Sequence, residues 1–117
     1  MSIKITVEVV EHVYDLLRQT APFDRWNLPY AEEIGFAITR DRNNRGEFYV
    51  DVLKVPFISV NQKFHHTLDE LIRTVAHEMC HLRDHLSGSR ADVSHGRSFN
   101  SLADTVCKHH NFDRGAF

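Results

Sequence analysis

Apolar residues recur every three or four positions between residues 68 and 86, which is the spacing of one face of an α-helix. Thr67 precedes this stretch with Glu70 three residues after it, the capping-box pattern of a helix start, and Gly88 follows where a left-handed C-terminal cap is expected. We therefore predict a helix over residues 68–86 whose apolar stripe faces the core. The stripe consists of Leu68, Leu71, Ile72, Val75, Met79, Leu82 and Leu86.

Two further helices are predicted near the ends of the chain. Residues 6–19 have helical apolar spacing, with Thr6 available as N-cap and Pro22 just past the end. The alternation of β-branched residues over residues 3–9 fits a strand equally well, so both interpretations stay open there. The last helix begins near His95 or Gly96 and ends at about residue 110. Its predicted buried side consists of Phe99, Leu102, Ala103 and Val106.

Three short strands are predicted in the middle of the chain. Apolar and polar residues alternate over residues 35–39 and 47–54, as in a strand. Residues 41–46 between them have the composition of a hairpin turn. A third strand is predicted over residues 57–60. The pattern indicates an α+β fold in which a small antiparallel three-stranded sheet packs against the 68–86 helix, with helices at both ends of the chain. Residues 21–33 are predicted as a loop whose aromatics Phe23, Trp26 and Tyr30 pack inward.

Length and composition set limits on the protein class. A chain of 117 residues is the size of one domain, here residues 1–117, and 42% hydrophobic with 26% charged residues is typical of a globular protein. No apolar run approaches the roughly 20 residues that span a bilayer, and the first residues do not form a secretory signal. We therefore expect a soluble cytoplasmic protein with no membrane partner.

Charge does not indicate a nucleic-acid binder. The net charge of −2 provides no global attraction to nucleic acid. Arg40, Arg42 and Arg45 form a local basic cluster, which we interpret as the solvated tip of the predicted hairpin. Nucleic acid stays a possible partner that the net charge does not support.

The predicted 68–86 helix carries His-Glu-Met-Cys-His at residues 77–81, which is the H-E-x-x-H pattern. His77 and His81 stand one turn apart on one helix face, opposite the apolar stripe. Zn²⁺ binds neutral imidazole, and a catalytic site combines three protein ligands with one open position for water. We therefore predict Zn²⁺ held by His77 and His81, with Glu78 as the catalytic base for peptide hydrolysis.

The third zinc ligand must come from elsewhere in the chain. No glutamate follows Glu78, which excludes the class with a glutamate ligand. The extended three-histidine motif requires Gly and His where this chain has Asp84 and Ser87. His85 continues the four-residue spacing but lies about 12 Å from His77 along the helix axis, so we interpret it as a solvated surface residue.

His95 is the candidate that the spacing favours. Gly88 ends the helix, and the polar connection over residues 89–94 can return the chain over the histidine face. His109 and His110 at the far end of the last helix are the alternatives. We interpret them as exposed residues that complement the helix dipole.

The two cysteines, Cys80 and Cys107, are interpreted as reduced core or boundary residues. An alternative makes the zinc purely structural, with Cys80 as a fourth ligand that closes the site. Cys80 projects about 100° from His81 around the helix, which is unfavourable for that arrangement. His65 and His66, just before the helix, either line the cleft or have no role in the site, and transition-state stabilisation is a further interpretation for His66.

Three elements of the chain resemble the SprT-like family of zinc metallopeptidases, to which the DNA–protein crosslink protease Spartan is related. They are the His-Glu-Met-Cys-His helix, the His-Gly-Arg-Ser-Phe segment that begins at His95, 14 residues after His81, and the strand over residues 58–61. The resemblance implies a zincin-like minimal domain with His77, His81 and His95 as zinc ligands and Glu78 as base. Residues 1–117 contain neither the zinc ribbon nor the basic region that many members append, and Arg97 replaces the usual proline.

The expected function is that of a zinc-dependent metallopeptidase acting on a protein or peptide substrate, with DNA-associated proteins as one substrate class. The strand over residues 57–60, placed at the sheet edge beside the cleft, is expected to pair with extended substrate. The alternative is a catalytically weak, zinc-containing binding or adaptor protein that retains the metallopeptidase fold.

Overall fold

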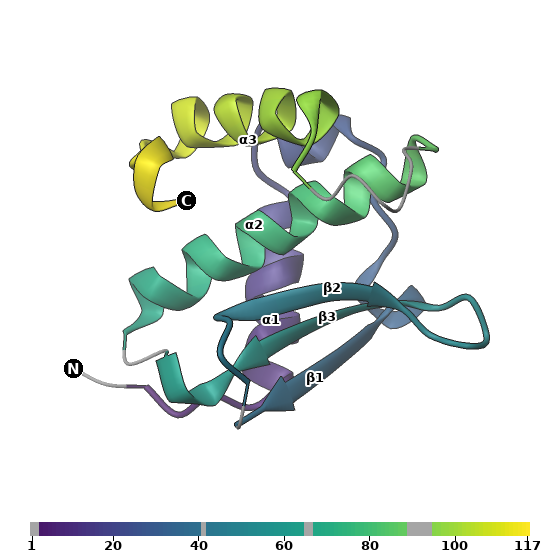
Figure 1. Cartoon of the computed structure of the whole chain (residues 1–117), viewed down its shortest axis with the longest axis vertical. Coiled ribbons are helices and arrows are strands. Elements are labelled where there is room, and N and C mark those ends of the chain that lie inside the picture. The colour runs from purple at the N-terminus through teal and green to yellow at the C-terminus, as the bar shows by residue number, and fades with distance from the viewer. Residues whose placement is uncertain (1–2, 41, 65–66, 89–94) are drawn as a thin grey trace.

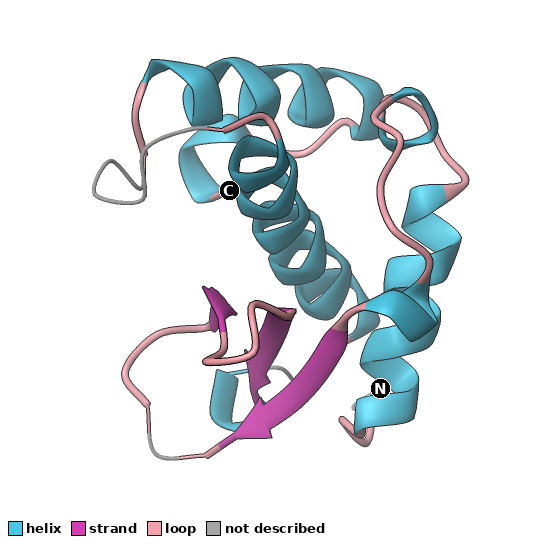
Figure 2. Cartoon of the chain, turned by 90° about the vertical axis from the view of Figure 1, so that its right-hand side faces the viewer, coloured by secondary structure: helices cyan, strands magenta, loops and turns pink. Residues whose placement is uncertain are grey.

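The computed structural model describes residues 3–40, 42–64, 67–88 and 95–117. Over these residues the fold is α+β, with three α-helices and one three-stranded sheet. Helix α2 lies between α3 and the sheet, and α1 packs beside α2 and the sheet (Figures 1 and 2). The elements are α1 (Val7–Arg18), β1 (Gly35–Thr39), β2 (Gly46–Val50), β3 (Pro56–Asn61), α2 (Leu68–Leu86) and α3 (Arg97–His110), with 3-10 turns η1 (Phe23–Arg25), η2 (Ala31–Glu33), η3 (Gln62–Phe64) and η4 (Arg114–Ala116).

The helix ends follow the local capping signals. Thr6 Oγ1 accepts a hydrogen bond from the main-chain nitrogen of Val9, so the helical interpretation of the first segment is correct and the strand interpretation is wrong. Thr67 forms the predicted capping box at the start of α2, and Gly88 has a φ of 87° just after that helix. Helix α3 ends at His110, and its C-cap residue Asn111 adopts the left-handed conformation.

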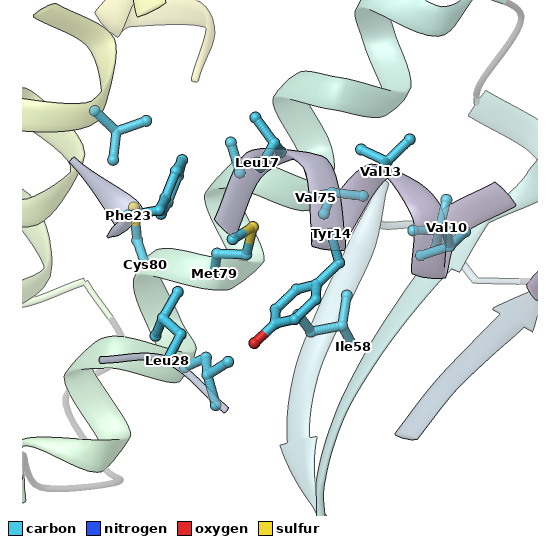
Figure 3. Close-up of a cluster of buried hydrophobic side chains, with 14 of the residues drawn as sticks. Val10, Val13, Tyr14, Leu17, Phe23, Leu28, Ile58, Val75, Met79 and Cys80 are labelled. Atoms are coloured by element: carbon cyan, nitrogen blue, oxygen red, sulfur yellow. The ribbon is translucent and has the colours of Figure 1, made fainter. Parts of the chain in front are cut away.

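The core lies where α1, α2 and β3 meet (Figure 3). Val10 and Tyr14 from α1, Ile58 from β3, and Val75 and Met79 from α2 are all fully buried there. Removing such side chains from water is the main favourable term in folding. The core therefore holds the middle of α2, the part that carries the H-E-x-x-H pattern, between the other elements.

The apolar stripe of α2 is buried only in its middle. Leu68 and Leu86 at the two ends are 49% and 46% exposed. Ala76 and Cys80 are fully buried although they lie outside the stripe, because α2 also packs against α3. Helix α2 is thus covered on more of its circumference than its sequence pattern indicates.

The sheet is mixed, and the predicted all-antiparallel arrangement is wrong. Its strand order is β1-β3-β2, with β1 parallel and β2 antiparallel to β3. Strands β1 and β2 do not pair, so residues 41–46 do not form a hairpin turn; residue 41 lies outside the described part of the chain. Because β3 is the central strand, the expectation that residues 57–60 lie at the sheet edge is also wrong.

The antiparallel hairpin is instead formed by β2 and β3, and Asp51 builds its turn. Asp51 Oδ1 accepts hydrogen bonds from the main-chain nitrogens of Leu53 and Val55, at 2.9 and 2.8 Å. Lys54 adopts a φ of 67° in the same turn. These contacts end β2 at Val50, four residues before the predicted end of that strand.

Asn61, the last residue of β3, ties the connection between β1 and β2 to the end of β3. Its side chain is fully buried, and its Nδ2 donates to the main-chain oxygens of Arg42 and Asn44, at 2.7 and 2.9 Å. Its own main-chain nitrogen donates to the Arg45 oxygen at 2.8 Å. The connection from β1 to β2 is therefore held across the end of β3.

Replacing Asn61 with Ala should lower the free energy of unfolding by about 2–4 kcal/mol, because two main-chain oxygens lose a buried donor. Urea denaturation of the metal-free protein measures the change. Asn43→Ala, in the exposed part of the same connection, is the matched control and should change stability by less than about 0.5 kcal/mol. A loss of similar size in both variants would contradict this stabilising role of Asn61.

The 21–33 segment packs its aromatics inward only in part. Phe23 and Trp26 are buried, as predicted, and their rings meet edge to face. Tyr30 is 58% exposed, so the prediction for this residue is wrong; its ring lies on the surface beneath the Arg18 guanidinium. None of the described helices has both the length and the apolar content needed to cross a membrane.

Candidate metal centre

Three histidine side chains meet at the junction of α2 and α3. His77 and His81 come from α2, and His95 lies just before α3; one ring nitrogen of each lies within 4.8 Å of the others. Nε2 of His81 and Nε2 of His95 are 3.1 Å apart. Two nitrogens bound to a tetrahedral zinc ion at about 2.0–2.1 Å are roughly 3.3 Å apart. The observed separation is close to that value, so the cluster can hold one metal ion.

Phe99, in the first turn of α3, packs against all three imidazoles. It is 2% exposed, and its ring centroid lies 4.2 Å from that of His81 and 4.4 Å from that of His95. Both pairs are stacked, and the His77 ring is tilted against Phe99 at 5.1 Å. The His-Gly-Arg-Ser-Phe segment therefore supplies His95 together with the aromatic ring that restricts the orientation of the cluster.

The orientation of His77 is set by a main-chain oxygen. Nδ1 of His77 donates a hydrogen bond to the Phe117 oxygen at 2.9 Å, since a carbonyl oxygen can only accept. The proton on Nδ1 leaves Nε2 with its lone pair free, which is the form that binds a metal.

Burial keeps the two α2 histidines neutral. The pKa of His77 is lowered to about 4, chiefly by burial, and the pKa of His81 is lowered to about 4 by burial and then by the neighbouring His77. At pH 7 both imidazoles are therefore neutral, with one ring nitrogen protonated and the other free to bind a metal. Neutral imidazole is the metal-binding form, so little proton release is needed before a metal binds.

Glu78 is buried between α2 and the start of β2. A Cβ placed on Gly46 would lie 3.3 Å from Glu78 Oε2, so the carboxyl group sits directly against this strand. Burial and, to a smaller extent, the charge of Glu47 raise the pKa of Glu78 to about 8. A bound divalent cation acts in the opposite direction and lowers this pKa. The carboxyl group can thus take up and release a proton near neutral pH.

A cleft of about 870 Å³ runs between α2 and β2. All five residues of β2, Gly46–Val50, line one side, and the three histidines and Glu78 lie in the same cleft. Phe117 borders it as well. The cluster is therefore open to a ligand the size of a peptide segment rather than sealed in the core.

The other histidines of the described chain lie outside the cluster. His85 is exposed, as predicted, and lines the cleft with its ring 5.6 Å from that of Phe48. His109 is exposed, as predicted. His110 is half-buried, so its predicted exposure is wrong; its Nε2 lies 3.1 Å from Thr20 Oγ1. His65 and His66 and the 89–94 connection fall outside the described residues.

The cysteines are core residues, as predicted. Cys80 and Cys107 are both buried and free. Among the described residues, the group whose ligand atoms converge consists of the three histidines and does not include Cys80. The alternative of a site closed by a cysteine therefore has no support in the geometry.

The donor set fits zinc. Three neutral imidazoles are a known ligand set for catalytic zinc, and they leave a fourth position for water or substrate. The His77 hydrogen bond to the Phe117 oxygen is the outer contact that metal-binding histidines ordinarily have, and the Phe99 ring packs against the other two imidazoles.

Two contributors to this site were not predicted from the sequence. The Phe117 oxygen belongs to a segment with no motif, and a main-chain atom leaves no signature in the residue types. Asn100 donates from Nδ2 to the main-chain oxygen of His95 at 3.2 Å. Its position one residue after Phe99 was the available signal, because the first turn of a helix faces the residues just before it.

Comparison with known proteins identifies one family. The model of the SprT-like family matches residues 15–114, a range that includes His77, Glu78, His81 and His95. No curated protein and no solved structure matches the chain.

Proposed function

The chain belongs to the SprT-like family, and from this premise we propose that it is a zinc-dependent metallopeptidase. In this proposal His77, His81 and His95 hold Zn²⁺, and Glu78 is the general base in the hydrolysis of peptide bonds. The observation that carries the proposal is the three-histidine cluster, which lies in the same open cleft as the buried Glu78 carboxyl group.

In the proposed mechanism Glu78 transfers the proton of the metal-activated water. Zinc, when bound, supplies Lewis-acid chemistry, which polarises the scissile carbonyl and lowers the pKa of a water from about 15.7 toward about 7. Glu78 accepts the proton of the attacking water and delivers it to the leaving amine. The raised pKa of Glu78 supports this role, because a base that must also act as an acid works best near the ambient pH.

The edge of β2 is the element that would align the substrate. Within the described residues β2 pairs only with β3, and its other side lines the cleft. An extended peptide that adds to this edge uses main-chain hydrogen bonds, which are independent of side-chain identity. The proposal therefore assigns to β2 the role first expected of residues 57–60, and it implies broad specificity for unfolded segments.

Proteins and peptides are the proposed substrates, and DNA-associated proteins are one class among them. The net charge of −2 provides no general attraction to DNA. Arg40, Arg42 and Arg45 are exposed in the described structure, so their side chains are accessible to DNA. DNA is therefore included as one arm of the assay.

The proposal is tested with metal-stripped protein and an unfolded polypeptide such as reduced, carboxymethylated lysozyme. We expect no cleavage by the stripped protein and cleavage once one equivalent of Zn²⁺ is restored, because the water lacks activation without the metal. Fragments are followed by mass spectrometry, with and without DNA, and zinc content by atomic absorption.

The outcomes separate the two candidate functions. Failure to bind about one zinc per chain would refute the proposed metal site. Binding of one zinc without cleavage in either arm would favour the adaptor interpretation. Cleavage that survives metal stripping would indicate a contaminating protease.

A further inference from the structure

The 113–117 turn, consisting of residues 113–117 and containing η4, packs against the metal-site face of α2. Asp113 Oδ1 accepts from the main-chain nitrogen of Gly115 at 3.0 Å, and the nitrogen of Phe117 donates to the Arg114 oxygen at 3.3 Å. Ala116 and Phe117 then line the cleft. This short turn is therefore a wall of the candidate metal site.

The turn meets His77 through two contacts. The Phe117 oxygen accepts from His77 Nδ1 at 2.9 Å, and the Phe117 ring centroid lies 5.3 Å from the His77 ring. The hydrogen bond selects the tautomer with Nε2 free, and the ring contact limits rotation of the imidazole. The position of this oxygen thus decides which His77 nitrogen can face a metal.

Arg114, a residue of the turn, ties the turn to α3. Its Nε donates to Asp104 Oδ1 at 2.7 Å, and its Nη2 donates to Asn100 Oδ1 at 3.0 Å. The ion pair is solvent-exposed, with side chains 42% and 68% accessible. Exposed pairs of this kind add little to global stability. The main effect of Arg114 is therefore local, on the place that the turn occupies.

Asn100 extends the same network to a second histidine. While its Oδ1 accepts from Arg114, its Nδ2 donates to the main-chain oxygen of His95 at 3.2 Å. The network therefore runs from the Phe117 oxygen beside His77, through Arg114 and Asn100, to the backbone of His95. Two of the three candidate ligands are held by it.

We propose that Arg114 and Asn100 are positioning residues of the metal site, which hold the 113–117 turn against His77 and fix the backbone of His95. The inference rests on the proposed function in one respect, that the cluster binds zinc. It adds that the affinity depends on contacts outside the ligand set.

The experiment measures zinc affinity of the full chain by competition with a chromophoric chelator. Arg114→Ala and Asn100→Ala should each weaken zinc binding by about 10–100-fold, the usual effect of removing an outer-shell partner. Arg114→Lys, which retains one donor for Asp104, should recover part of the loss. The circular dichroism spectrum should match the parent in all three variants, because the hydrogen bonds that these substitutions remove lie at the surface.

Two matched controls lie away from the site. Arg18→Ala removes an Arg–Asp pair of similar length, 2.9 Å to Asp15 on α1, and Asn43→Ala removes an exposed asparagine from the β1–β2 connection. Both should bind zinc as tightly as the parent. A loss of affinity in the controls equal to that in Arg114→Ala would show a general effect of stability and overturn the inference.

A measurement on the parent itself completes the test. In the zinc-loaded protein, long-range proton–nitrogen NMR should show the His77 proton on Nδ1. A proton on Nε2, or unchanged zinc affinity in Arg114→Ala and Asn100→Ala, would overturn the inference. A parent chain that binds no zinc would instead refute the proposed function, so the two failures are distinguishable.

Discussion

Replacing Glu78 with Gln should lower the rate of peptide hydrolysis by about 10²–10⁴-fold while the zinc content stays at the parent level. General acid–base catalysis by one positioned side chain has this magnitude. Gln has nearly the same shape as Glu but cannot accept the proton of the attacking water. Because Glu78 is not among the converging nitrogen ligands, the metal should remain bound. Initial rates on the unfolded polypeptide and zinc analysis of the same sample measure both quantities.

The stability of the metal-free variant provides an internal check. The pKa of Glu78 is raised to about 8 in the folded protein from an ordinary value of 4.5. A raised carboxyl pKa means that the free energy of unfolding of the parent falls as the pH rises from about 4.5 to about 8. Glu78→Gln lacks this decline, so relative to the parent it should become more stable over that range. Urea denaturation at pH 5 and pH 8 measures the difference.

The matched control is Glu70→Gln. Glu70 lies on the same helix and lines the same cleft, and its Oε1 accepts from the Thr67 nitrogen in the capping box. Gln preserves that cap, so activity should stay within about threefold of the parent. Equal activity of parent and Glu78→Gln, with zinc bound in both, would end the case for Glu78 as base and favour the adaptor interpretation.

The helices could be predicted because their signals are local. The bounds of α2, residues 68–86, follow from apolar spacing, the capping box that begins at Thr67 and the glycine at position 88, all within the segment itself. The same holds for the placement of His77 and His81 one turn apart on that helix. A pattern that repeats with the helical period needs no information from the rest of the chain.

The path between β1 and β2 could not be predicted because it is held by contacts with a buried side chain far along the chain. The segment over residues 41–46 has turn composition, but its path is set by Asn61, which binds the oxygens of Arg42 and Asn44. Asp51 was assigned to a strand although its carboxylate builds the turn that follows. Both errors arise where a polar side chain bonds to a main-chain atom of another residue.

In the candidate site, too, the ligand could be predicted from the sequence and the main-chain contacts around it could not. His95 was favoured from spacing and from the family resemblance, and the structure brings its Nε2 to 3.1 Å from that of His81. The Phe117 oxygen and the Asn100 bridge were missed, because a main-chain acceptor can be supplied by any residue type. The outer contacts of this metal site can therefore be identified only from the three-dimensional structure.

Replacing His95 with Ala should weaken zinc binding by a factor on the order of 10²–10³. Zinc sites with four protein ligands have apparent binding free energies of about 10–16 kcal/mol, so one ligand accounts for roughly 2.5–4 kcal/mol. His95 is exposed, so its removal should leave the free energy of unfolding of the metal-free protein nearly unchanged. The change in zinc affinity can then be assigned to the lost ligand. Chelator competition measures it, and activity at limiting zinc should fall in parallel.

Two histidines make matched controls for this substitution because each could be taken for the third ligand. His85 lies on α2 and lines the cleft, and His109 is exposed on α3, but neither belongs to the converging cluster. His85→Ala and His109→Ala should both retain the parent's zinc affinity within about threefold. Since all three variants lose the same imidazole, a non-specific effect of removing a histidine would appear in each. Tight binding that persists in His95→Ala but is lost in either control would place the third ligand elsewhere and remove the geometric basis of the site.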